Sequence, residues 1–236
     1  MLAGVPVAFT HEGRRAADFF AAFRTEVPPI LTVSVTPEEI ENEYRAERPS
    51  ADRAALGADR GYGEALALYR RFCHALPALG GFFLHAGFFT YRGHGIALLA
   101  NSGVGKSTHI ARWRELCGSE VRVINGDKPL VRRVEGRFLG YGAPLSGKEG
   151  WCEHTEAPIT ELILLARGER DTVTPVTAAD AFPTLFSSVL APEGEAELAC
   201  LLPLLSELLS TVRVYRATVT KELSAAIAVR RAICED

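Results

Sequence analysis

One segment, IALLANSGVGKSTHIARW at residues 96–113, limits what this chain of 236 residues can fold into. The four apolar residues from Ile96 to Leu99 predict a short buried strand, and the residues from Lys106 onward predict a helix. The turn between them is small and polar. This order of strand, loop and helix matches the phosphate-binding pattern GxxxxGK[ST], with Ala100 at the position of its first glycine.

The residue types in this turn suit the binding of an anion. Small residues let backbone N–H groups curl around a phosphate, and the new helix directs its unsatisfied N–H groups and positive dipole end at the same place. In this pattern Lys106 reaches the outer phosphates and Ser107 ligates magnesium. The candidate nucleotide-binding residues are Asn101, Ser102, Gly103, Val104, Gly105, Lys106, Ser107 and Thr108.

A carboxylate follows the next apolar strand along the chain. Val121, Val123 and Ile124 predict that strand, which ends at Asn125-Gly126-Asp127. Ligands of α/β sheets bind at the carboxyl ends of strands, so Asp127 is a candidate metal ligand and catalytic group. The alternative is an ordinary turn residue.

Two further candidates flank these motifs. His85 lies in a predicted strand, Phe82 to Tyr91, and is either a functional residue or a hydrogen-bonded core histidine. Lys148 lies in the glycine-rich segment Gly142 to Gly150, which we expect to be a mobile basic loop facing phosphates. Its alternative is a solvated lysine. His94 and His109 are assigned to surface or packing, because neither has a second ligand at metal spacing.

The remaining elements follow from periodicity and turn residues. The Thr36-Pro37-Glu38-Glu39 segment has the form of a capping box and predicts the start of a helix, whereas Arg45 to Gly63 is predicted to be a loop. The other expected elements are strands at Val5–Thr10, Ile30–Val35, Glu161–Ala166 and Val212–Val219, a hairpin of Pro129–Val134 with Phe138–Tyr141, and helices at Tyr62–Leu76, from Thr177, at Glu195–Leu209 and at Lys221–Ile233. We expect residues 1–80 to pack on a P-loop core at residues 81–236, in one compact unit.

Composition excludes several classes of protein. The hydrophobic fraction of 47% and charged fraction of 23% are those of an ordinary globular protein. The net charge of −3, with scattered arginine pairs, argues against nucleic-acid and membrane binding. There is no signal-peptide pattern at the N-terminus, and the apolar run Leu198 to Leu209 is too short and too interrupted to span a bilayer, so we expect a cytoplasmic protein.

The five cysteines are odd in number, widely spaced and without a CxxC pair, which argues against disulfides and a zinc site. They indicate a reducing compartment, and each is expected to be a small buried hydrophobe rather than a nucleophile. Cys152, in a loop close to the other candidates, is the one whose role as a nucleophile stays open.

Taken together, these motifs resemble the HPr-kinase-like branch of the PEP-carboxykinase type of P-loop proteins, and more closely its small stand-alone members. The resemblance covers residues 30–235 and is carried by the His85 strand, ANSGVGKSTHIARW (100–113), INGDKP (124–129), YGAPLSGKEG (141–150) and WCEHTEAP (151–158). It implies a mixed α/β core with antiparallel hairpins and flanking helices, in agreement with the hairpins expected above. The implied chemistry is phosphoryl transfer from ATP, with Mg²⁺, to a hydroxyl.

In this resemblance Lys106 and Ser107 match the phosphate and magnesium residues, and Asp127 matches the acidic motif. His85 matches a histidine that precedes the P-loop hairpin, and Lys148 a basic residue of the flexible loop. The chain departs from the pattern at Gly126, where relatives carry the first residue of an Asp-Asp pair.

Three classes of function stay open. The first is a kinase for a hydroxyl-bearing small metabolite or a Ser or Thr of a peptide, with Asp127 or His85 accepting the proton. The second is a nucleotide-binding module that has lost transfer, which Gly126 favours, and the third is NTP hydrolysis or phosphorolysis at the same site. The sequence leaves open the acceptor, ATP against GTP and the oligomeric state.

Overall fold

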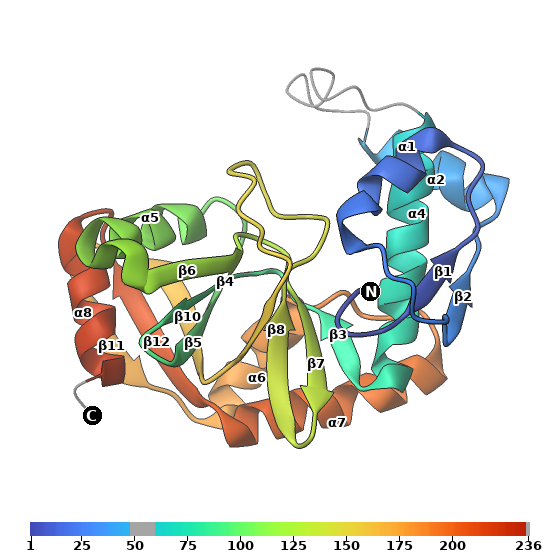
Figure 1. Ribbon diagram of the computed structural model, residues 1–236. Coiled ribbons are helices and arrows are strands. Elements are labelled where there is room, and N and C mark those ends of the chain that lie inside the picture. Colours follow the sequence, from blue (N-terminus) through green and yellow to red (C-terminus); the bar gives the residue numbers. More distant parts are fainter. Residues whose placement is uncertain (48–59, 235–236) are drawn as a thin grey trace. The chain divides into compact units, whose positions relative to one another are not determined.

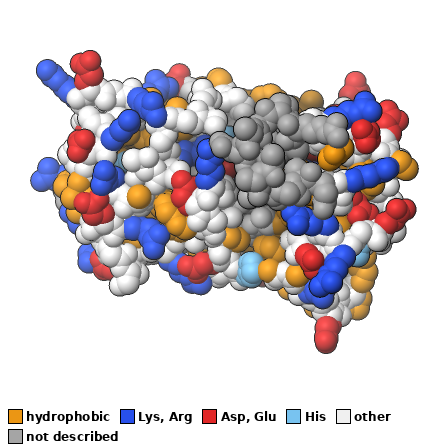
Figure 2. Space-filling view, turned by 90° about the horizontal axis from the view of Figure 1, so that it is seen from above, with side chains coloured by type: hydrophobic (Ala, Val, Ile, Leu, Met, Phe, Trp, Pro, Cys, Tyr) orange, Lys and Arg blue, Asp and Glu red, His pale blue; other side chains and the backbone are white. Residues whose placement is uncertain are grey.

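The computed structural model describes residues 1–47 and 60–234, and the chain divides into two compact units, Met1–Ala75 and Leu76–Asp236. Each unit is described by itself, and the packing of the first 80 residues on the core stays a prediction. Within the described residues, every helix is too short or too polar to cross a membrane. Acidic and basic side chains are interspersed on the face drawn in Figure 2.

The first unit combines two short parallel strands with helices. Both predicted strands are confirmed with shorter bounds. The elements are β1 (Val7–Phe9), α1 (Arg14–Phe19), η1 (Ala21–Phe23), β2 (Leu31–Val33), α2 (Pro37–Glu47) and α4 (Arg60–Ala75). The predicted loop from Arg45 to Gly63 is wrong at both ends, because α2 continues to Glu47 and α4 begins at Arg60; the stretch between lies outside the described residues.

The predicted capping box at the start of α2 is confirmed. The backbone N–H of Thr36 donates to Oε2 of Glu39 at 2.7 Å, and the N–H of Glu39 donates to Oγ1 of Thr36 at 3.3 Å. Each side chain thus satisfies a backbone donor that the first helical turn leaves without a partner.

The second unit contains two sheets. The six-stranded sheet has the order β11-β12-β10-β5-β4-β6, in which β10 runs parallel to β5 and β12 while the other pairs are antiparallel. The four-stranded sheet has the order β3-β7-β8-β9 and is antiparallel. The strands are β3 (Gly81–Phe83), β4 (Ala86–Tyr91), β5 (His94–Leu99), β6 (Val121–Asn125), β7 (Leu130–Val134), β8 (Arg137–Tyr141), β9 (Glu156–Pro158), β10 (Glu161–Arg167), β11 (Thr172–Pro175) and β12 (Arg213–Val219). The prediction of a mixed sheet with antiparallel hairpins is therefore confirmed.

Helices cover both faces of the six-stranded sheet, as Figure 1 shows. Ile96 and Leu98 of β5 point to a core shared with α5 and α8, and Ala97 and Leu99 point to one shared with α6, α7 and the four-stranded sheet. Alternation of side chains along each strand divides these two cores. The helices are η2 (Leu76–Leu79), α5 (Lys106–Cys117), η3 (Gly118–Glu120), α6 (Ala178–Ser187), α7 (Glu195–Thr211) and α8 (Leu223–Cys234).

Two tight hairpins connect neighbouring strands. Arg92 and Gly93 join β4 to β5 with φ of 47° and 87°, and Glu135 and Gly136 join β7 to β8 with φ of 49° and 77°. Two successive positive φ values match the twist of the flanking strands.

The predicted single strand from Phe82 to Tyr91 is wrong. The chain leaves the four-stranded sheet after β3 and enters the six-stranded sheet at β4, with Leu84 and His85 between them. Their backbone groups are held elsewhere, because the N–H of Leu84 donates to Pro129 O at 3.1 Å and that of His85 to Ser188 O at 2.6 Å. A continuous apolar pattern cannot reveal that its two halves pair in different sheets.

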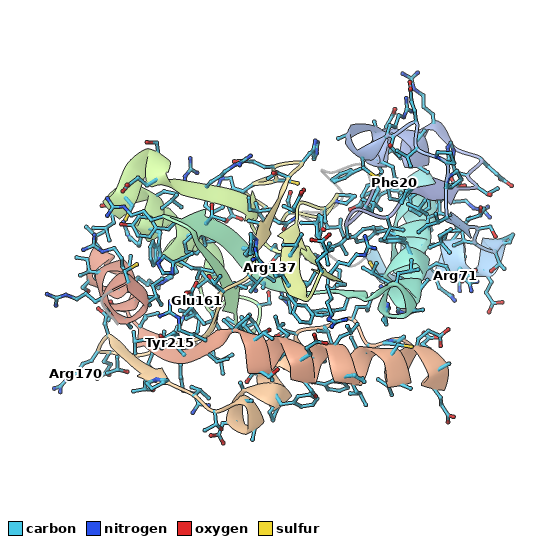
Figure 3. The ribbon with its side chains drawn as sticks, turned by 60° about the horizontal axis from the view of Figure 1, so that its bottom comes forward. Phe20, Arg71, Arg137, Glu161, Arg170 and Tyr215 are labelled. Atoms are coloured by element: carbon cyan, nitrogen blue, oxygen red, sulfur yellow. The ribbon has the colours of Figure 1, made fainter. Side chains whose placement is uncertain are left out.

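A buried carboxylate lies at the other end of β10 from Arg167. Glu161, labelled in Figure 3, is fully buried and contacts Nδ1 of His94 at 3.0 Å and the guanidinium of Arg213 at 2.5 Å. His94, predicted to have a surface or packing role, thus contacts this carboxylate at the starts of three adjacent strands.

Candidate functional site

The P-loop segment connects the end of β5 to the start of α5. Gly103 and Gly105 adopt φ of 80° and 122°, and the N–H of Val104 donates to Asn101 O at 3.2 Å. A side chain at Gly103 would meet no atom within 4 Å, so glycine is needed there for backbone conformation and not for space. The N-cap residue of α5, Gly105, has no side chain with which to cap the helix, so the first N–H groups of α5 face the loop.

An arginine that the sequence analysis did not identify holds this loop from outside. Arg167, the last residue of β10, donates from Nε to Val104 O at 2.9 Å and from its terminal nitrogen to Gly103 O. Its only signal in the sequence is its place at the end of an apolar strand. Because the carbonyl groups face Arg167, the loop is fixed in a peptide orientation that does not depend on a bound anion.

Three predicted site residues meet at one point. Lys106 Nζ lies 3.0 Å from His85 Nε2 and 3.8 Å from Asp127 Oδ1, and it donates to Ala100 O at 3.1 Å. His85 Nε2 and Asp127 Oδ1 are 3.2 Å apart. The break between β3 and β4, the start of α5 and the turn after β6 thus bring together residues far apart in the sequence.

Burial and charge shift the pKa values of this cluster in a consistent way. Burial lowers the pKa of Lys106, and the nearby Asp127 charge opposes that shift. For Asp127, burial by itself would raise the pKa, but the hydrogen bond and charge of His85 with the charges of Lys128 and Lys106 outweigh it, so the pKa is lowered. Asp127 therefore remains a carboxylate at neutral pH.

The turn that carries Asp127 is held by a buried amide. Asn125, the last residue of β6, is completely inaccessible to solvent. Its Oδ1 accepts hydrogen bonds from the N–H groups of Asp127 and Lys128 at 3.0 and 2.7 Å. Its Nδ2 donates to the carbonyl groups of Ala143 and Leu145 at 3.2 and 3.1 Å. The sequence analysis treated Asn125 only as part of a turn.

The basic loop approaches Asp127 through Gly147 and not through Lys148. A Cβ at Gly147 would lie 2.9 Å from Cβ of Asp127, so the loop backbone contacts the carboxylate residue directly. Lys148 itself is exposed. The loop backbone at Gly147 therefore lies beside the cluster, whereas the ammonium group of Lys148 makes none of the contacts described above.

The packing at Gly126 gives a physical reason for the missing first acid. A Cβ at this position would lie 3.1 Å from Ser146 O and 3.4 Å from Cβ of Trp151, both in the segment that follows β8. The N–H of Gly126 also donates to Trp151 O at 2.9 Å. A side chain at this position would therefore lie in unusually close contact with the loop and with Trp151.

His109 is buried, its Nε2 accepts a hydrogen bond from Trp113 Nε1 at 3.2 Å, and burial lowers its pKa to about 4. The prediction of buried cysteines holds for Cys73 and is wrong for Cys200 and Cys234, which lie exposed on helices. The thiol of Cys152 donates to Ala143 O at 3.3 Å, and burial raises its pKa. Such a thiol stays protonated at neutral pH, which argues against a nucleophilic role.

The donor set suits magnesium better than a metal bound by protein alone. Within residues 1–47 and 60–234, no three His, Cys, Asp or Glu side chains gather as a metal site. Mg²⁺ in kinases is bound by one or two carboxylates, waters and substrate phosphates. Asp127 provides a carboxylate and Ser107, in the first turn of α5, a partly exposed hydroxyl group, so both stay candidate magnesium ligands.

Comparison with known proteins gives little further information. No family model matches the chain, and no curated protein matches it. Among solved structures, the chain is similar to the HPr(Ser) kinase/phosphatase from Coxiella burnetii, with 9% sequence identity and a TM-score of 0.38 over 65% of this chain and 97% of that one. A similarity this low carries no argument about activity, so membership of the predicted family and the PEP-carboxykinase-like core stay predictions.

Proposed function

We propose that this chain binds a nucleoside triphosphate with Mg²⁺ at residues 101–108 and transfers its γ-phosphoryl group to a hydroxyl acceptor. The observation that carries the proposal is the cluster of a buried lysine with a carboxylate within 4 Å, at the mouth of a glycine turn that opens a helix. An ordinary turn has no need of a buried ammonium group at this position.

The phosphates would lie against the N–H groups of the loop and the start of α5. Lys106 is already held by Ala100 O and needs little further ordering to reach the outer phosphates. Ser107 and Asp127 would hold Mg²⁺, which neutralises charge on the phosphates when it is bound. The fixed orientation of these groups supplies the positioning on which phosphoryl transfer mainly depends.

In the transfer step, the acceptor oxygen forms a bond to the γ-phosphorus as the bond from that phosphorus to the bridging oxygen breaks. Asp127, with His85 beside it, would accept the proton of the hydroxyl group. Lys148 would approach the developing charge when the loop closes, since Gly147 already lies against Asp127. The acceptor is a small metabolite or a Ser or Thr of a peptide.

A second candidate function is nucleotide binding without transfer, which the single carboxylate at the turn favours. With Gly126 packed against Trp151, Asp127 must serve both as the metal ligand and as the proton acceptor. A site that cannot do both at once would bind a nucleotide and turn it over slowly or only to water.

The deciding experiment incubates the protein with Mg²⁺ and γ-labelled ATP in a fractionated cell extract, beside the variants Lys106→Ala and Asp127→Asn. We expect label in one acceptor fraction, lost with both variants, and nucleotide binding that only Lys106→Ala abolishes. Binding without any labelled acceptor would reject the kinase proposal in favour of the binding module. Release of free phosphate that both variants abolish would identify a hydrolase.

A further inference from the structure

We infer that Asn125 is a positioning residue that ties the Asp127 turn and the loop of Lys148 into a single unit. Its catalytic consequence rests on the function proposed above, but the link itself is a property of the nucleotide-free protein. Asn125 ends β6, is fully buried, and lies two residues before Asp127 without contacting any reacting group.

The oxygen of Asn125 shapes the turn. It accepts from the N–H groups of both Asp127 and Lys128, so the backbone on either side of the Asp127 side chain is fixed by one atom. Asparagine side chains stabilise turns in this way by taking the place of a backbone acceptor. The direction in which the carboxylate leaves the backbone is therefore set from the interior.

The nitrogen of Asn125 holds the loop. It donates one hydrogen bond to Ala143 O and one to Leu145 O, three residues before Lys148. A primary amide has two donor hydrogens and two acceptor lone pairs, and here all four are used. The orientation of the amide is unambiguous, because exchanging its oxygen and nitrogen would set donors against N–H groups and an acceptor against carbonyl groups.

No other side chain of this size replaces that pattern. Aspartate keeps the two acceptor contacts but sets a charged oxygen against two carbonyl groups, and leucine loses all four hydrogen bonds. The approach of Gly147 to Cβ of Asp127 is an independent contact between the same two segments. Displacement of the loop therefore disturbs Asp127 by two routes.

The test measures limited trypsin cleavage of the nucleotide-free protein after Lys148, by mass spectrometry. Asn125→Asp keeps the turn but releases the loop, so we expect cleavage after Lys148 to be at least tenfold faster. Cleavage after Arg170, an exposed residue in a different turn, serves as the internal control and should not change. Equal acceleration at both bonds would mean that Asn125 supports the fold as a whole and would overturn the inference.

A second pair of variants leaves the core untouched. Gly147→Ala and Gly150→Ala both place a side chain at positive φ, 82° and 65°, but only the first has its Cβ against Asp127, while the second meets nothing within 4 Å. We expect Gly147→Ala alone to accelerate cleavage after Lys148. Equal rates for the two variants would overturn the link between loop and carboxylate.

Transfer kinetics then separate this inference from the proposed function. If the chain is a kinase, Asn125→Asp and Gly147→Ala should lower kcat at least tenfold and change the Kd for ATP less than threefold. A protein without transfer activity would still show the cleavage pattern. In that case the proposed function fails and the positioning role of Asn125 stands.

Discussion

Lys106 Nζ lies 3.0 Å from Nε2 of His85, a nitrogen that is also 3.2 Å from Oδ1 of Asp127. One ring nitrogen either accepts from the ammonium group or donates to the carboxylate, and it cannot do both at once. The position of one proton therefore decides whether His85 supports the lysine or the aspartate. One nitrogen of His85 thus lies within hydrogen-bond distance of both charged groups.

Replacing His85 should raise the pKa of Asp127. The hydrogen bond and charge of His85 come first among the influences that lower this pKa against the effect of burial. In His85→Ala, burial remains and this opposition is weakened, so the carboxyl group protonates at a higher pH. Carboxyl-carbon NMR titration of the free protein measures the shift, with exposed His11→Ala as the control. An unchanged or lower pKa of Asp127 would contradict the hydrogen-bond arrangement described above.

Removing Arg167 should loosen the phosphate loop without unfolding the protein. Arg167→Ala loses two charge-assisted hydrogen bonds to loop carbonyl groups, and we expect nucleotide affinity to fall about five- to tenfold. Arg170→Ala is the matched control, because that exposed arginine lies in the turn after the same strand and is directed outward in Figure 3. Calorimetric titration with MgATP checks both variants. Equal affinities would show that the loop does not depend on Arg167.

Restoring the missing acid should not improve the site. Gly126→Asp places a side chain against Ser146 O and Trp151, and we expect a loss of about 1–3 kcal/mol in stability from crowding, with no gain in transfer rate. Gly126→Ala separates the effect of the added Cβ from that of the charge. Urea unfolding measures the stability of both. A Gly126→Asp variant with a higher transfer rate and unchanged stability would refute this explanation of Gly126.

His109 should make the protein less stable in mild acid. Its pKa is about 4 in the folded state and about 6.5 in the unfolded state, so below pH 6.5 the unfolded chain binds a proton that the folded one does not. His109 therefore adds nothing to the pH dependence of the free energy of unfolding above pH 6.5, and this free energy falls by about 3 kcal/mol as the pH is lowered to 4. His109→Gln keeps an acceptor for Trp113 and should flatten this dependence. Urea unfolding at pH 7, 5.5 and 4 compares the two proteins.

Removing Arg213, the cation that pairs with Glu161, should destabilise the folded protein. Arg213→Met removes the guanidinium from a fully buried carboxylate, and we expect a loss of about 3 kcal/mol in stability. The double variant Glu161→Gln with Arg213→Met removes the uncompensated charge as well and should be more stable than Arg213→Met alone. Thermal and urea unfolding of the three proteins test this order. A double variant less stable than Arg213→Met would show that the charge is not the source of the cost.

Local patterns predicted most of the fold, because each rests on contacts between neighbours in the chain. The capping box at Thr36 and the hairpin of Pro129–Val134 with Phe138–Tyr141 are examples, and both appear as expected. The strands β9 and β11 were missed because their sequences, EAP and TVTP, carry a proline and no run of apolar residues. Apolar periodicity cannot identify a strand that has no run of apolar residues.

The residues of the candidate site likewise fall into those that a local pattern predicts and those that depend on contacts between distant segments. Lys106 and Asp127 could be predicted as site residues because their positions follow from a motif and a strand end, and the structure brings their side chains within 3.8 Å. Arg167 and Asn125 were missed, since each acts through backbone carbonyl or N–H groups of distant segments and needs no distinctive residue beside it. Which carbonyl groups face them is decided by tertiary packing, and a single sequence does not record it.

The chain passes between the two sheets of the second unit at residues 84–85 and again at residues 126–129, and these two crossings carry His85 and Asp127. The N–H of Leu84 donates to Pro129 O, so the crossings are fastened to each other. The spacing between the His85 imidazole and the Asp127 carboxylate therefore depends on how the two sheets pack on each other. A substitution that shifts one sheet against the other should therefore change this spacing even where both residues are kept.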